Sequence, residues 1–154
     1  MLTIANDYQY IRYRERIMAT IADTAAYRGR PWLNLPPDSR TILWALRRLV
    51  IGWPRPPCLH AALIEAYGDN ACGIEHLLRC LLTGIAMHGT QRLEIGAPCC
   101  AALLPHEAEL LEAIGLDGAE PDPSALVRLC DNPAAAPLSV IAAGIRTAVI
   151  CAAH

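Results

Sequence analysis

The chain contains no lysine and no phenylalanine, so all 13 of its basic side chains are arginines. Charged residues make up only 18% of the sequence and the net charge is −2, which excludes a strong electrostatic attraction to nucleic acid or anionic lipid. Hydrophobic residues, at 54%, exclude an intrinsically disordered polar chain. The cations are planar guanidinium groups, which suit carboxylate, phosphate and aromatic contacts better than ammonium groups do.

The first ten residues lack the uninterrupted apolar segment of a signal peptide, because Asn6, Asp7 and Gln9 interrupt it. We therefore expect a cytoplasmic protein whose seven cysteines are free thiols or metal ligands, since an odd number cannot pair completely. The apolar stretch 133–153 contains Arg146 and many alanines, which predicts a buried helix and no transmembrane segment. A peripheral membrane contact is left open.

Hydrophobic periodicity predicts an all-α fold, and a length of 154 residues is typical of one domain. We expect a single-domain bundle of six or seven helices. Residues 1–37 are expected to form an N-terminal helical arm and a Pro-rich connector, and residues 38–154 the helical core domain. Apolar and polar residues alternate between Thr90 and Pro98, but no second strand is available for pairing, so we expect an extended connector there.

Capping and stop signals predict where several helices begin and end. Ser39 is expected to be the N-cap of a helix that stops at Gly52. Gly68 ends a short helix, and Gly89 ends the next one, whose leucine and isoleucine spacing makes it the candidate central core helix.

The C-terminal third predicts three further helices. Pro105 suits the first turn of one, in which Glu107 is expected to be solvated. A short helix begins at Asp122 and Pro123, and the last helix is expected to begin at about Pro137. Three cysteines in apolar helical surroundings are expected in the core: Cys58, Cys130 and Cys151.

Two groups of thiols could carry chemistry. Cys99 and Cys100 precede a predicted helix start, where backbone N–H groups and the helix dipole favour thiolate, although packing as small hydrophobes is the alternative. Cys72, His76 and Cys80 follow one another at intervals of four along one edge of the candidate central helix. Residues eight apart lie about 12 Å apart along a helix axis, so only adjacent members can share an ion without help.

These thiols support an alternative function, a metal-binding or redox-sensing protein that uses zinc or another thiophilic metal. The candidate ligands are Cys72, His76, Cys80, Cys99, Cys100 and His106. Their spacing matches no established zinc signature. A cysteine-dependent enzyme would use Cys100, His106 and Glu107, which are near one another only in sequence, and no Gly-rich phosphate loop is present.

Tyrosines and arginines interleave near the N-terminus. Such residues can stack on bases, but they are also enriched at protein-interface hot spots, and the chain is slightly acidic overall. We therefore favour a protein partner or a homo-oligomer over nucleic acid. The predicted partner-binding residues are Tyr8, Tyr10, Arg12, Tyr13, Arg16 and Trp32. The function predicted from the sequence is that of a non-catalytic accessory or regulatory protein acting through protein–protein contact.

Several segments together resemble a small bacterial family of unknown function marked by an Ala-Pro-Cys-Cys segment. They are Ile-Leu-Trp-Ala-Leu-Arg-Arg-Leu at 42–49, His-Ala-Ala at 60–62, Ala-Tyr-Gly at 66–68, Leu-Leu-Arg-Cys-Leu-Leu at 77–82, Ile-Gly-Ala-Pro-Cys-Cys at 95–100 and Glu-Ala-Glu-Leu-Leu at 107–111. In that family a third cysteine and a proline typically follow, where this chain has Ala101 and Ala102. The resemblance implies a compact cytoplasmic helical domain and nothing catalytic.

Overall fold

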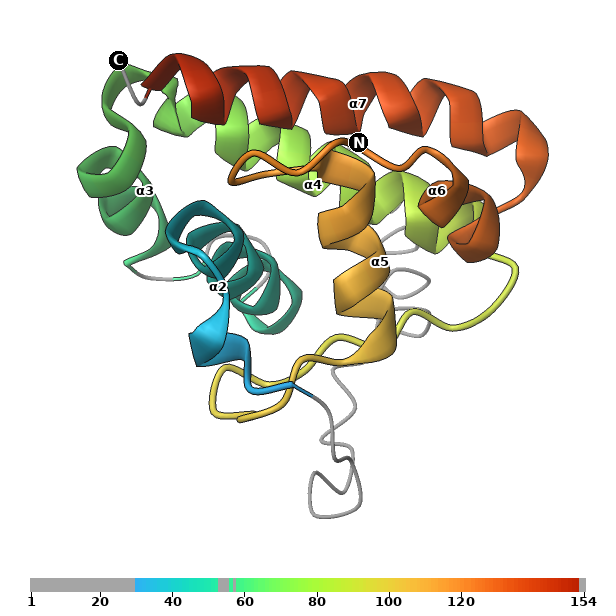
Figure 1. Cartoon of the computed structure of the whole chain (residues 1–154), viewed down its shortest axis with the longest axis horizontal. Helices are drawn as coiled ribbons and strands as arrows, with labels where there is room; N and C mark the ends of the chain where they lie inside the picture. Colours follow the sequence, from blue (N-terminus) through green and yellow to red (C-terminus); the bar gives the residue numbers. More distant parts are fainter. Residues whose placement is uncertain (1–29, 53–55, 57, 153–154) are drawn as a thin grey trace, which may run out of the picture.

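The computed structural model describes residues 30–52, 56 and 58–152 (Figure 1). The described chain forms helices and no strand, which confirms the all-α prediction. Its elements are the 3-10 helices η1 (Trp32–Asn34) and η2 (Gly68–Asn70) and the α-helices α2 (Pro37–Ile51), α3 (Leu59–Tyr67), α4 (Ala71–His88), α5 (Pro105–Ile114), α6 (Ser124–Leu129) and α7 (Asn132–Ala152). The predicted helix before residue 30 lies outside the described residues, as do Tyr8, Tyr10, Arg12, Tyr13 and Arg16.

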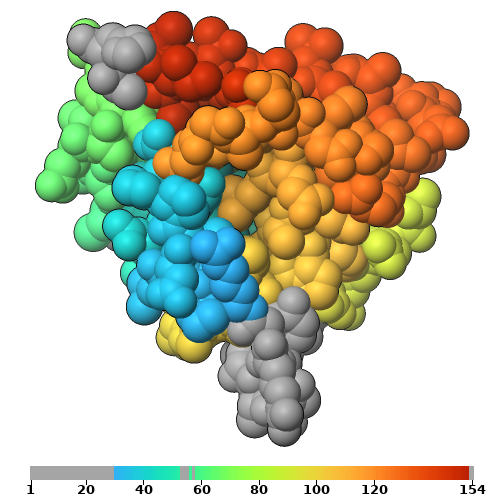
Figure 2. Space-filling view, viewed as in Figure 1, coloured from blue at the N-terminus to red at the C-terminus, as the bar shows by residue number. Residues whose placement is uncertain are grey.

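Helices α4 and α7 lie side by side along most of their lengths, with α3 at one end and α6 near the other (Figure 1). Helix α5 packs against α6 and α7, and α2 joins the bundle through α3, α4 and α5. Apolar side chains from all of these helices, from Ile42 in α2 to Val149 in α7, form one buried cluster. The space-filling view shows the helices closely packed against one another (Figure 2).

Three predicted helix ends are confirmed. Helix α2 stops before Gly52, whose N–H donates to the Arg48 carbonyl oxygen at 2.9 Å. Helix α3 ends at Gly68, whose φ of 55° lies in the region that glycine adopts most readily. Helix α4 ends at Gly89, where an added Cβ would lie 2.7 Å from the carbonyl oxygen of Ile85, so a side chain would not fit. The segment from there to α5 is the expected extended connector, and its two isolated bridges pair Gly89 with Cys130 and Ala102 with Pro31.

The prediction that Ser39 is an N-cap is wrong, because α2 begins two residues earlier, at Pro37. The cap comes instead from the distant connection between α5 and α6. Asp117 accepts hydrogen bonds from the backbone N–H groups of Asp38 (3.1 Å) and Ser39 (2.8 Å), and from the Ser39 hydroxyl (2.6 Å). Asp117 thus satisfies N–H groups that Pro36, as N-cap, leaves without a side-chain acceptor.

Helix α7 also begins earlier than predicted, at Asn132, and contains Pro137 within it. Asp131 starts the helix by accepting the Ala134 N–H at 3.0 Å, and proline near an N-terminus costs one backbone hydrogen bond. Arg146, the one charged residue of α7, turns to the connection between α5 and α6 and donates to the carbonyl oxygens of Gly115 and Ala119. Local capping signals therefore predicted neither the start of α7 at Asn132 nor the contact of Arg146 with the connection between α5 and α6.

Candidate functional site

The Ala-Pro-Cys-Cys loop is built around a buried ion pair, Arg47 of α2 and Glu107 of α5, both fully buried. The Arg47 Nε and Nη2 atoms each lie 2.8 Å from one oxygen of Glu107, a bidentate arrangement. The remaining Arg47 donors reach the carbonyl oxygens of Cys100 and Ala102 at 2.7 Å and of Ala97 at 3.4 Å. All five guanidinium N–H groups therefore have an acceptor.

The Glu107 carboxylate is equally occupied. Beyond Arg47, it accepts the backbone N–H of Gly96 at 2.8 Å and of Leu104 at 2.9 Å. Through the contact with Leu104, Glu107 accepts the backbone N–H of the N-cap residue of α5. We call Arg47, Glu107 and these backbone groups the Arg47–Glu107 network. The predicted solvated position of Glu107 is wrong, because a partner sixty residues away draws the carboxylate into the interior.

This network fixes the two adjacent cysteines in different environments. The loop turns at Pro98 and Cys99, and the Cys100 N–H donates to the Ala97 carbonyl at 2.8 Å. Cys99 is consequently exposed at the corner of the turn. Cys100 is buried, and its Sγ lies 3.5 Å from the carbonyl oxygen of Ala102.

Trp32 covers the same guanidinium, with its ring centre 5.1 Å from Arg47 Cζ. The backbone of η1 is attached as well, since the Trp32 N–H donates to the Ala101 carbonyl at 3.1 Å. Trp32 is therefore part of the packing over the loop, whereas its neighbour Leu33 is 61% exposed. Of the predicted partner-binding residues, Trp32 is the one within the described part of the chain.

The three residues considered for a cysteine-dependent enzyme each have other partners. Cys100 is buried near the Ala102 carbonyl, and Glu107 is bound to Arg47. The Nδ1 atom of His106 accepts the backbone N–H of Glu94 at 2.8 Å. These contacts hold the connector between α4 and α5 in place.

A different arrangement occurs on the exposed edge of α4. His76 and Cys80 are one helical turn apart, and the Sγ of Cys80 lies 3.6 Å from the Nε2 of His76. Cys72 and His76 are exposed and Cys80 is half-buried. The predicted i, i+4 edge thus brings one thiol and one imidazole into contact.

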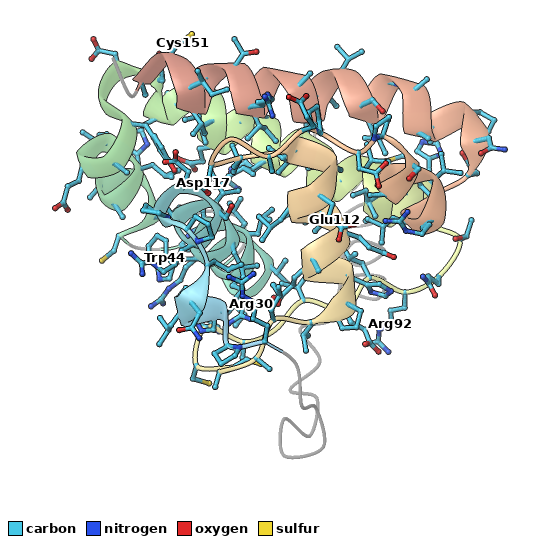
Figure 3. All side chains as sticks on the ribbon, in the orientation of Figure 1. Arg30, Trp44, Arg92, Glu112, Asp117 and Cys151 are labelled. Atoms are coloured by element: carbon cyan, nitrogen blue, oxygen red, sulfur yellow. The ribbon has the colours of Figure 1, made fainter. Side chains whose placement is uncertain are left out.

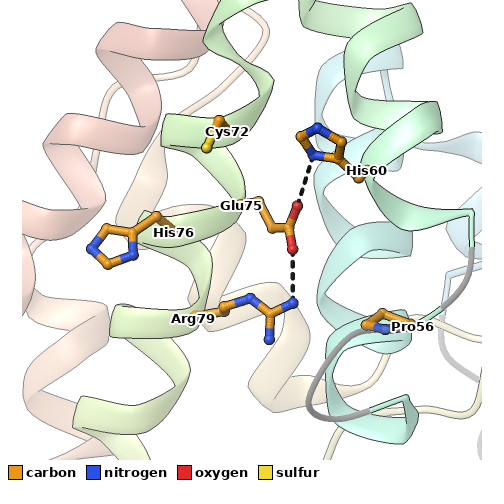
Figure 4. A pocket seen from close by; sticks show the side chains of 6 residues that line it. All are labelled: Pro56, His60, Cys72, Glu75, His76 and Arg79. Carbon is orange, nitrogen blue, oxygen red and sulfur yellow. Dashed lines mark hydrogen bonds and ion pairs between the residues drawn. The ribbon is translucent and has the colours of Figure 1, made fainter.

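Beside this edge, α3 and α4 border an open pocket that we call the α3–α4 pocket (Figure 4). Its lining residues are Pro56, His60, Cys72, Glu75, His76 and Arg79. Glu75 is its centre, since the Arg79 Nη2 donates to one carboxylate oxygen at 2.7 Å and the His60 Nδ1 lies 3.1 Å from the other. Both contacts are drawn in Figure 4.

Arg79 and His60 stabilise the ionised form of the Glu75 carboxylate. Partial burial by itself would raise the pKa of Glu75, but the hydrogen bonds with Arg79 and His60 outweigh it and hold the pKa below its usual range. The pocket therefore presents a carboxylate whose two oxygens are shared between a guanidinium and an imidazole. His60 carried no spacing signal in the sequence, but Glu75 and Arg79 stand at the i, i+4 spacing of a helical ion pair.

The structure does not gather the six predicted metal ligands into one site. Cys99, Cys100 and His106 belong to the loop and helix around the Arg47–Glu107 network, whereas Cys72, His76 and Cys80 lie on α4. Within residues 30–52, 56 and 58–152, no group of three or more His, Cys, Asp or Glu side chains is placed to hold a metal ion. His76 and Cys80 are the pair in contact.

All seven cysteines are free thiols. Cys130 is buried, as predicted, and its Sγ lies 3.0 Å from the Leu126 carbonyl oxygen. The prediction that Cys58 and Cys151 are core residues is wrong, since both are exposed. Cys58 precedes α3 with a left-handed backbone, and Cys151 lies on the outward side of the end of α7 (Figure 3).

A third surface feature is the outward side of α7. Apart from Asn132 at its first position, the exposed residues of α7 are Pro133, Ala136, Pro137, Val140, Ala143, Thr147, Ile150 and Cys151, which we call the outer face of α7. Val140 is 72% exposed and Ile150 is 44% exposed. By length and composition α7 could cross a membrane, but a single helix of this kind is weak evidence, because core helices of globular proteins meet the same criteria.

The chain matches no family model, no curated protein and no solved structure. The resemblance carried by the Ala-Pro-Cys-Cys segment therefore stays a prediction.

Proposed function

We propose that this is a non-catalytic accessory or regulatory protein of the cytoplasm that acts through protein–protein contact. The outer face of α7 is its contact surface, and the partner is a second copy of the chain or another subunit. A second contact element is the N-terminal helical arm of residues 1–37, with its tyrosines and arginines. Together with the core domain, this arm makes a bundle of six or seven helices.

The observation that carries the proposal is the absence of charge on the outer face of α7. None of its eight residues is an aspartate, glutamate, arginine or histidine, and the helix spans about 31 Å. Its polar side chain is also occupied, since the Thr147 hydroxyl donates to the Ala143 carbonyl at 2.9 Å. Exposed apolar strips of this kind are typical of surfaces that another protein covers.

The position of Arg146 supports the same conclusion. The one charged side chain of α7 is directed to the carbonyl oxygens of Gly115 and Ala119, away from the outer face. An apolar partner helix can therefore lie along α7 without burying an unpaired charge, which would cost several kcal/mol.

Native mass spectrometry of the full chain, purified from its own host, tests the proposal with a matched pair of variants. Val140→Asp places a charge on the outer face of α7, whereas Ile64→Asp places one at an exposed apolar residue of α3, outside both proposed contact elements. We expect an assembly larger than one chain that Val140→Asp dissociates and Ile64→Asp leaves intact.

Both substitutions are at exposed positions, so each should change the free energy of unfolding by about 0.5 kcal/mol or less. Thermal unfolding checks that the variants remain folded. A single-chain mass for the unaltered protein, or an assembly that Val140→Asp leaves intact, would contradict the proposal.

A further inference from the structure

We infer that the Nε2 atom of His76 and the Sγ atom of Cys80 form a two-ligand chelate for a zinc-class divalent cation on the exposed edge of α4. This inference goes beyond the proposed protein contact, because no residue of the outer face of α7 takes part. It depends on the geometry of one helical turn, on the chemistry of the two donors and on the open surface beside them.

The distance between the two donors matches the requirement of a tetrahedral ion. Zinc binds cysteine sulfur at about 2.3 Å and histidine nitrogen at about 2.0 to 2.1 Å, so at a tetrahedral angle the two donors stand about 3.6 Å apart. The observed separation of Sγ and Nε2 is 3.6 Å. An ion can therefore bind both without a change in the α4 backbone.

The chemistry of the pair selects the class of ion. Thiolate and imidazole together favour zinc and other thiophilic transition metals over magnesium and calcium, which prefer oxygen ligands. Without an ion, the Cys80 thiol lies within hydrogen-bond distance of the His76 imidazole. Binding of a divalent cation forms one bond to sulfur and one to nitrogen, and the proton from the Cys80–His76 pair is released to solvent.

The surface around the pair is accessible. His76 is exposed and Cys80 is half-buried, and a Cβ added at Gly73, one turn away, would meet no atom within 4 Å. Cys72 lies about 12 Å from Cys80 along the helix axis, too far to complete the same site. Since the described part of the chain supplies no third ligand, the remaining positions of the ion are open to water or to an external ligand.

An open site of two protein ligands holds its ion less tightly than a closed four-ligand site. It exchanges its remaining ligands readily, as catalytic zinc sites do and structural ones do not. The inferred site is thus suited to reversible metal binding.

Cobalt(II) titration of the full chain tests the inference, because a tetrahedral cobalt ion with a thiolate ligand has a sulfur-to-metal charge-transfer band. The protein is first stripped with a chelator, which is then removed. We expect a band that saturates at one cobalt ion per chain, is displaced by zinc, and appears with release of one proton. Cys80→Ser should abolish the band, and His76→Ala should weaken cobalt binding about tenfold or more.

Three cysteine variants serve as controls. Cys99→Ser and Cys151→Ser remove exposed thiols elsewhere and should keep the band. Cys72→Ser removes the other thiol at the i, i+4 spacing from His76 and should keep it as well. The inference is overturned if no band forms, if Cys80→Ser retains it, or if Cys72→Ser removes it. Circular dichroism checks that each variant keeps its helix content, so that loss of the band reports the site.

Discussion

The Arg47–Glu107 network and the α3–α4 pocket each join an arginine to a glutamate, but they differ in what surrounds the pair. Arg47 and Glu107 are fully buried, and backbone groups occupy the remaining donors and acceptors. Glu75 and Arg79 remain partly exposed, at 17% and 18%, and His60 at the same carboxylate is 56% exposed. The same residue types hold the fold together in one place and line an open surface in the other.

The comparison shows that the Ala-Pro-Cys-Cys segment serves to stabilise the fold more than to bind a ligand. The carbonyl groups of Ala97 and Cys100, and that of Ala102 just beyond them, accept hydrogen bonds from Arg47, so these backbone groups are used within the protein. On α4 the thiol and imidazole groups contact each other at the surface and remain accessible to an ion. Burial with full hydrogen bonding thus separates the groups that stabilise the fold from those that can bind a ligand.

The largest effect is expected for Arg47→Met. It leaves the Glu107 carboxylate buried without its counter-ion and removes the guanidinium donors from three carbonyl groups, so the free energy of unfolding should fall by about 3 to 5 kcal/mol. Arg48→Met is the matched control, because Arg48 is exposed and its guanidinium lies over the Trp44 ring. Urea unfolding measures both, and equal effects of the two substitutions would show that the network does not stabilise the fold.

A smaller effect is expected for Gly96→Ala. The new Cβ would lie 3.1 Å from both Arg47 Nη2 and Cys100 Cβ, and the guanidinium cannot move away without losing its acceptors. The substitution should destabilise the protein by about 1 to 3 kcal/mol. Gly73→Ala on α4 meets open space and should instead stabilise it by about 0.5 to 1 kcal/mol through helix propensity. Thermal unfolding of the two variants should show shifts of opposite sign.

The smallest effect is expected at Glu75. Its pKa is lowered in the folded protein, so its carboxylate stabilises the fold above its unfolded pKa, and this contribution is lost as the pH falls through the folded pKa. Because the pair is partly exposed, Glu75→Gln should cost only about 0.5 kcal/mol at neutral pH. Urea unfolding from neutral pH to below about pH 4 should show the difference disappear on acidification. A difference that persists at acidic pH would mean that packing, and not charge, accounts for it.

Local signals were sufficient for much of the helical framework. The leucine and isoleucine spacing of α4, the glycines that end α3 and α4 and the proline at the start of α5 are read within one or two helical turns. The i, i+4 spacing also identified the edge on which His76 meets Cys80. These features depend on neighbours in the sequence, which is why the sequence predicts them.

The tertiary structure decided where long-range partners meet. Asp117 caps α2 from 78 residues beyond Ser39, and Arg47 draws Glu107 inside from 60 residues away. Neither pair leaves a periodic or short-range pattern, so Ser39 looked like a cap and Glu107 like a solvated first-turn residue. The amino-acid sequence by itself determined that this chain is helical and apolar, because that depends on local propensity and composition. Helix packing decided which of its polar side chains are buried and stabilise the fold, and which are exposed. The reason is that burial of a polar group is favourable only where distant groups satisfy every donor and acceptor.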